Sequence, residues 1–192
     1  MYRFKVRLVA ALLAFGTGIL VISFWMARNH SLAMSSNELL VPQTKEIELT
    51  KDTVITLDRS ACYGYCPEYT LTISGDGSVV FVLRMNGKEV RKVTSIISQE
   101  KLKEIIKEFN KADYFSLKDK YINQEDDGCP EYWTDQPDVN TSIKTNGRIK
   151  SISHYHGCRE NRGRTIYPKG LTELERKIDE IVNTKQWNPW MR

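Results

Sequence analysis

Two Asn-Gly dipeptides, at residues 86–87 and 146–147, limit the folds open to this chain more than any other feature of its sequence. Asn-Gly is the strongest short signal for a β-hairpin, because both central residues of a type I′ turn need a positive φ. Each dipeptide therefore predicts a pair of antiparallel strands. The four strands cover residues 79–85 and 89–97 for the first dipeptide, and 138–145 and 148–156 for the second.

The first hairpin extends into a larger sheet. Residues 69–73 alternate between polar and apolar side chains, and a turn at 74–78 links them to the hairpin. Together these segments predict a three-stranded antiparallel meander. Residues 46–58 alternate well enough for one further strand or two short ones.

Two helices follow the two groups of strands. Ser98 can cap a helix over 99–112, and a second helix is predicted over 168–183; each presents one apolar stripe. The order predicts an α+β domain, in which an antiparallel sheet (three-strand meander plus a later hairpin) has two helices packed on one face. Trp187 and Trp190 are expected to pack back on the core.

The chain opens with a segment typical of exported proteins. Residues 8–27 carry no charge and form a stretch long enough for a helix to cross a bilayer. Three basic residues precede this stretch. Residues 1–33 thus read as a signal peptide, cleaved near Ala33, or as a retained signal anchor; the alternative is a buried core helix. Residues 34–45 predict a linker, and 46–192 a single α+β domain. The expected location is the cell envelope, periplasmic or extracellular, inner-membrane anchored or secreted.

The charge distribution argues against nucleic acid as a partner. The formal net charge is +4, but residues 1–33 hold four basic and no acidic side chains, so the rest of the chain holds 24 of each sign. Such a neutral body lacks the basic surface that phosphate backbones require. With 41% hydrophobic and 27% charged residues, the composition is that of a globular protein and excludes a disordered chain.

Four cysteines in an exported domain are expected to form two disulfides. Of three possible pairings we favour Cys62–Cys66 together with Cys129–Cys158, since the second bridge would pin the long polar loop of residues 119–138. A metal-binding or catalytic thiol pair at Cys62 and Cys66 is the alternative. Redox pairs of the thioredoxin type, however, have two intervening residues and begin a helix, whereas here three intervene and a strand follows.

The densest chemical segment is His154-Tyr-His-Gly-Cys158. Two imidazoles at i and i+2 of a strand share one face and can ligate one metal ion, for which zinc would be the cofactor. In the alternatives, His154 and His156 hydrogen-bond the long loop or act as acid–base or ligand-contact groups, and no cofactor is expected. Carboxylates of the long loop that could complete a metal site are Asp126, Asp127 and Asp135.

Aromatic residues gather near the same segments. Exposed Tyr and Trp on loops can stack on sugar rings or anchor a protein partner, although ordinary core and rim packing is the plainer interpretation. The residues of this possible binding surface are Tyr63, Tyr65, Tyr132 and Trp133.

The order of these motifs resembles an uncharacterised family of exported bacterial domains, a domain of unknown function. The resemblance rests on Cys62-Tyr-Gly-Tyr-Cys-Pro-Glu-Tyr69 before a Gly-Asp-Gly turn, on Asp135-Gln-Pro137, on the His154 to Cys158 segment, and on a last helix before Trp187. A Phe-x-x-Leu step of the family is shortened here at Phe115. The resemblance covers roughly residues 50–187 and implies export but no activity.

No nucleophile elbow, phosphate-binding loop or metalloprotease motif is present in the sequence. We therefore expect a non-enzymatic, disulfide-stabilised binding module, whose partner is an envelope protein or a cell-wall component, with the membrane contacted through residues 8–27. The alternatives are a metal-binding protein or metal-dependent hydrolase centred on His154 and His156, and an exported thiol oxidoreductase that uses Cys62 and Cys66.

Overall fold

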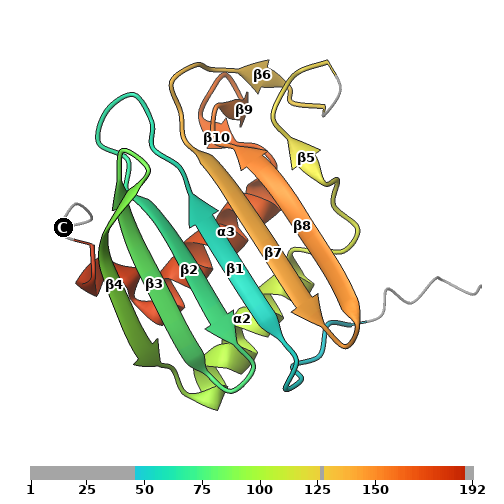
Figure 1. Ribbon diagram of the computed structural model, residues 1–192. Helices are drawn as coiled ribbons and strands as arrows, with labels where there is room; N and C mark the ends of the chain where they lie inside the picture. Colours follow the sequence, from blue (N-terminus) through green and yellow to red (C-terminus); the bar gives the residue numbers. More distant parts are fainter. Residues whose placement is uncertain (1–45, 126–127, 189–192) are drawn as a thin grey trace, which may run out of the picture. The chain divides into compact units, whose positions relative to one another are not determined.

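The computed structural model describes residues 46–125 and 128–188 (Figure 1). The predicted leader 1–33, the linker 34–45 and Trp190 lie outside these residues. Within the described part of the chain, no helix is both long and apolar enough to span a bilayer.

The first four strands follow one another as an antiparallel meander, one strand longer than the meander predicted from residues 69–97. Residues 46–49, which the alternation predicts as part of a strand, do not form a strand in the structure. Ile47 is nonetheless held in place, because its backbone N–H and carbonyl both bond the side-chain amide of Asn110, at 2.7 and 2.9 Å. The strands are β1 (Val54–Arg59), β2 (Glu68–Ser74), β3 (Ser78–Met85) and β4 (Lys88–Ile96).

The second hairpin joins the meander in one seven-stranded sheet. β7 (Asp138–Thr145) and β8 (Arg148–Tyr155) pair with each other, and β7 also pairs with β1. The sheet order is β4-β3-β2-β1-β7-β8-β5, where the short β5 (Lys120–Tyr121) is parallel to β8. Both Asn-Gly dipeptides have positive φ at the two residues, as the type I′ prediction requires.

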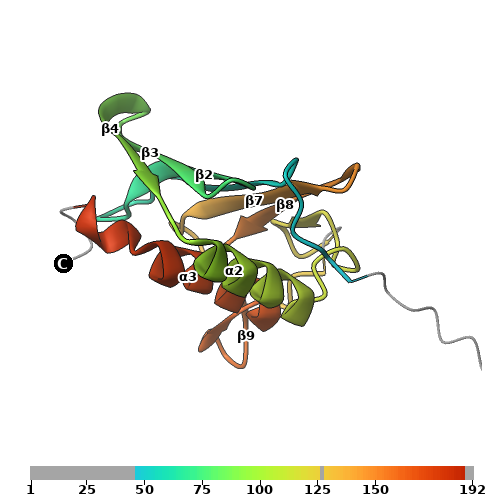
Figure 2. The same cartoon turned by 90° about the horizontal axis from the view of Figure 1, so that it is seen from below.

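Both helices cover one face of this sheet (Figure 2). In α2 (Gln99–Lys111), Ser98 accepts a hydrogen bond from the Lys101 backbone N–H, as predicted. The helix α3 (Lys169–Val182) ends at Asn183, which adopts a left-handed conformation with φ of 62°. The core between the layers includes Trp187, which packs on Phe81 with ring centroids 5.4 Å apart and thus confirms its predicted return to the core.

A second, three-stranded sheet was not predicted, and its first strand lies within the predicted loop of residues 119–138. β6 (Glu131–Tyr132) pairs with β9 (Cys158–Glu160), and β9 pairs with β10 (Thr165–Ile166). Strands of two or three residues are too short to show an alternating pattern, so the sequence carries no signal for them. A short 3-10 turn, η1 (Thr184–Gln186), follows α3.

Candidate functional site

A buried cluster of three ionisable side chains lies between the sheet and α3. His154 comes from β8, His156 from the turn that follows, and Glu175 from α3; we term them the His–Glu–His trio. His154 Nδ1 lies 2.9 Å from Glu175 Oε1, and His156 Nε2 lies 2.9 Å from Glu175 Oε2. The side chains of His154 and Glu175 are fully buried, whereas 14% of the His156 side chain is exposed.

Local structure explains why these three side chains meet. Alternation along β8 turns His154 inward beside Ile152, and the helical stripe of α3 that includes Leu171 and Ile178 also includes Glu175. The chain can turn closely after His156 because the next residue is Gly157, where a Cβ atom would lie 2.0 Å from the Trp133 carbonyl oxygen.

The surroundings of the trio change two pKa values. Burial by itself would raise the pKa of Glu175, but the two imidazoles outweigh it and lower this pKa to about 2. Burial lowers the pKa of His156; Glu175 opposes this, and the charges of His154 and Arg59 add to it. At neutral pH the trio therefore holds an ionised Glu175 and a neutral His156.

The hydrogen bonds of His154 then locate the protons. His154 Nε2 lies 3.0 Å from the carbonyl oxygen of Tyr167, which can only accept, so Nε2 carries a hydrogen. Its Nδ1 faces Glu175 Oε1, so an acceptor lies at each ring nitrogen of His154. His156 Nε2 donates to the second carboxylate oxygen. Both oxygens of the buried carboxylate therefore have an imidazole partner, as a buried charged group requires.

The same three residues are also a possible metal-ligand set. One ligand atom from each lies within 4.8 Å of the others. The carboxylate that joins His154 and His156 is Glu175, which the sequence analysis did not single out. Asp135 is exposed and accepts a hydrogen bond from Thr134, and its side chain does not belong to this set; Asp126 and Asp127 lie outside the described residues. A metal site built on the two histidines stays a prediction.

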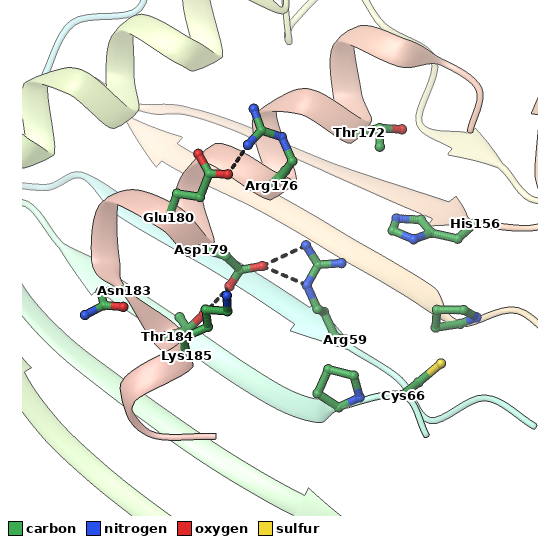
Figure 3. Close-up of a pocket in the computed structure, with 12 residues that line it drawn as sticks. Arg59, Cys66, His156, Thr172, Arg176, Asp179, Glu180, Asn183, Thr184 and Lys185 are labelled. Carbon is green, nitrogen blue, oxygen red and sulfur yellow. Dashed lines mark hydrogen bonds and ion pairs between the residues drawn. The ribbon is translucent and has the colours of Figure 1, made fainter. Parts of the chain in front are cut away.

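Next to the trio, α3 and the ends of β1 and β8 enclose an open cavity of about 660 Å³ (Figure 3). His156 is the member of the trio that reaches it. Apolar walls come from Pro67, Pro137 and the Cys66 side chain. The remaining lining residues are Arg59, Thr172, Arg176, Asp179, Glu180, Asn183, Thr184 and Lys185.

An ion pair between β1 and α3 forms one side of the cavity. Arg59 Nη2 lies 2.8 Å and Arg59 Nε lies 3.0 Å from Asp179 Oδ2. Tyr69 donates its hydroxyl to Asp179 Oδ1 at 2.5 Å, and Arg59 Nε lies 2.9 Å from the same hydroxyl oxygen. Only 13% and 15% of the Arg59 and Asp179 side chains are exposed. The pair therefore fixes the guanidinium at the cavity surface.

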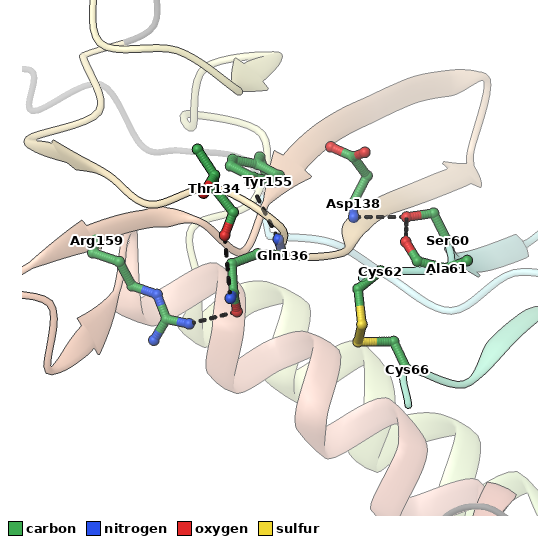
Figure 4. The surroundings of a disulfide bond; sticks show 9 residues. All are labelled: Ser60, Ala61, Cys62, Cys66, Thr134, Gln136, Asp138, Tyr155 and Arg159. Atoms are coloured by element: carbon green, nitrogen blue, oxygen red, sulfur yellow. Dashed lines mark hydrogen bonds between the residues drawn. A yellow bond between two sulfur atoms is a disulfide. The ribbon is translucent and has the colours of Figure 1, made fainter. Parts of the chain in front are cut away.

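The structure has the favoured disulfide pairing, Cys62–Cys66 and Cys129–Cys158, which we term the short bridge and the long bridge. The short bridge lies beside the start of β7, where Asp138 donates its backbone N–H to Ser60 (Figure 4). The long bridge links the segment before β6 to β9. Two disulfides indicate an oxidising, extracytoplasmic environment. A thiol-redox role of the short bridge stays a prediction.

The four aromatic candidates divide into two pairs. Tyr63 and Tyr65 lie inside the loop closed by the short bridge and are 90% and 98% exposed. Tyr132 and Trp133, about half exposed, lie at β6 and are partly packed: Tyr132 on Tyr155, with ring centroids 5.1 Å apart, and Trp133 on the turn that contains Gly163. Only the first pair is exposed throughout.

The sequence analysis missed Glu175, Arg59 and Asp179. A signal existed for the first, because an acidic residue inside the apolar stripe of α3 is unusual and needs a buried partner. No comparable signal marked Arg59 or Asp179, which lie 120 positions apart and meet only after β1 and α3 pack.

Comparison with known proteins places the chain in a family without assigning it an activity. No curated protein matches the chain. A family model described as a domain of unknown function, DUF6438, matches residues 53–182, which include β1 to α3 with the trio and both disulfides. Because this match extends over more than half of the chain, the chain belongs to the DUF6438 family of domains of unknown function.

Proposed function

We propose that this protein is a non-enzymatic binding module of the bacterial cell envelope, and that the cavity beside α3 is its ligand site. The observation that carries the proposal is the cavity itself: a concave site of about 660 Å³ with apolar walls and a few fixed polar groups, typical of ligand-binding pockets. The exposed Tyr63 and Tyr65 in the short-bridge loop add a surface for a larger partner.

Its location supports an envelope partner. The disulfides favour a periplasmic or extracellular compartment, and the apolar segment 8–27 would either anchor the domain at the inner membrane or direct its secretion. An envelope protein or a cell-wall component is then the expected partner.

The cavity lining favours binding over covalent catalysis. Cys66 is oxidised in the short bridge, and the Thr172 hydroxyl donates to the backbone carbonyls of Ile166 and Pro168, at 3.4 and 3.3 Å. Neither group is hydrogen-bonded to His156. The Thr184 hydroxyl, also in the lining, donates to Asp179 Oδ1 at 2.9 Å, but that carboxylate is ion-paired with Arg59 and is therefore not a free base for a nucleophile.

Filling the cavity tests the proposal. We would screen a set of small fragments by ligand-observed NMR against the full-length chain, and against Thr172→Trp, which places an indole in the cavity. Lys169→Trp is the matched control, because Lys169 is exposed on the same helix and does not line the cavity. We expect fragments that bind the wild type and the control but not Thr172→Trp. If every bound fragment also binds Thr172→Trp, the cavity is not the ligand site.

A metal-binding role is the second candidate, favoured by the ligand atoms of the His–Glu–His trio within 4.8 Å of one another. An ion would have to displace the imidazole protons that bond Glu175, so zinc binding would release protons. We would add zinc to the metal-free, full-length chain. A rise in melting temperature that Glu175→Gln abolishes would support this role; no rise at a large excess of zinc would refute it.

A further inference from the structure

The Arg59 guanidinium has one nitrogen that is held by neither Asp179 nor Tyr69. Its Nε and Nη2 bond Asp179 and Tyr69, but Nη1 has no hydrogen-bond partner among the residues that the structure describes. Figure 3 shows this nitrogen pointing away from Asp179, on the side where His156 lies. The two other nitrogens hold the group in place, so Nη1 is presented to the cavity in a fixed direction.

His156 offers a second polar atom to the same space. Its Nε2 is bonded to Glu175, while Nδ1 has no partner within the described part of the chain. The backbone N–H of His156 bonds the Pro137 carbonyl, which also keeps the ring at the cavity wall. Since Nε2 is bonded to Glu175, Nδ1 is the ring nitrogen left to face a ligand.

The charges around the cavity leave a positive excess. Asp179 is paired with Arg59, and Glu180 with Arg176. Lys185 is exposed and forms no ion pair in the described structure. An anion is therefore the ligand charge that the cavity favours.

This inference rests on the proposed function: we propose that the cavity binds a carboxylate that bears an apolar group. Arg59 Nη1 donates to a carboxylate oxygen of the ligand. The apolar group packs against Pro67 and Pro137. The shared chemistry is the free carboxylate, whether it belongs to a small acid or to the end of a peptide chain.

Paired acids and amides test this inference on the full-length chain. The probes are 4-methylpentanoate and 4-methylpentanamide, and a pentapeptide ending in leucine with a free or an amidated C-terminus. Isothermal titration calorimetry should show each acid binding at least about tenfold more tightly than its amide, the loss expected for about one charge-assisted hydrogen bond. Tighter binding of the peptide acid would identify a chain end as the source, and tighter binding of the small acid a free metabolite.

Variants separate the carboxylate contact from folding. The double variant Arg59→Gln/Asp179→Asn removes both charges of the buried pair, so neither partner is left uncompensated, and it should lose the preference for acids. Lys185→Ala should weaken acid binding about two- to threefold at low salt, and Lys169→Ala, an exposed lysine outside the cavity, should leave it unchanged.

Equal binding of acid and amide would overturn the carboxylate inference while leaving the binding module intact. The carboxylate inference would also fail, and the binding module would stand, if fragments bind in the cavity and neither acid does. If neither these probes nor any fragment binds in the cavity, the proposed function fails as well.

Discussion

Replacing Glu175 by glutamine removes the charge at the centre of the His–Glu–His trio while keeping nearly the same volume. The carboxylate accepts from both imidazoles at 2.9 Å, and its side chain is fully buried. Glutamine has one acceptor oxygen, so one of the two imidazoles loses its acceptor.

The size of the effect follows from the pKa. Lowering the pKa of Glu175 from 4.5 to about 2 corresponds to about 3 kcal/mol of unfolding free energy, at about 1.4 kcal/mol for each pKa unit. Breaking a buried ion pair by removing one partner costs about 3–5 kcal/mol in other proteins, which agrees. We therefore expect Glu175→Gln to lower the free energy of unfolding at pH 7 by about 3–5 kcal/mol.

The pH dependence has a definite sign. The folded-state pKa of Glu175 is lower than its unfolded value, so its stabilisation is complete above pH 4.5 and disappears as the pH falls toward 2. The difference between wild type and Glu175→Gln should shrink in that window. Glu173→Gln, on the same helix but paired only with the exposed Arg176, is the control and should change stability little.

Urea unfolding followed by circular dichroism at several pH values measures these quantities. A loss below about 1 kcal/mol for Glu175→Gln at pH 7, or a difference that stays constant from pH 7 to 2.5, would refute the ionised carboxylate between two imidazoles.

Other perturbations test the remaining features. Replacing both cysteines of the long bridge by serine should cost about 3–4 kcal/mol, against about 2 for the short bridge, because the bridged residues are 29 and 4 positions apart; equal losses in urea unfolding would contradict this. The pKa of His156 is lowered in the folded state, so the protein should lose stability as the pH falls below 6.5, and His156→Gln should lack that loss when unfolding free energies at pH 7.5 and 5.5 are compared. Gly157→Ala should cost about 1–3 kcal/mol by overpacking, whereas Gly170→Ala, which has open space, should not lower the melting temperature.

Much of the fold was accessible from the sequence because its signals are local. The two Asn-Gly turns, which need positive φ, and the period-2 alternation predicted β2, β3, β4, β7 and β8. Most of the predicted strand ends lie within about one residue of the observed ones. The Ser98 cap and the apolar stripes predicted both helices. Each of these signals depends on the conformational preferences of neighbouring residues.

The prediction was incomplete where pairing is not local. The sequence predicted a meander and a separate hairpin, but it could not show that β1 joins them by pairing with β7, because either edge of a sheet offers the same backbone groups. The small sheet was missed because its strands are too short for a pattern.

The sequence by itself determined the local elements, the fold class, the family resemblance and the residues His154 and His156 as a chemical segment. Only the tertiary structure decided what those histidines face. Glu175 lies 21 positions from His154, and Asp179 lies 120 from Arg59. Side chains so far apart along the chain become partners through the packing of α3 on the sheet, and their charges acquire their effect only after that packing excludes water.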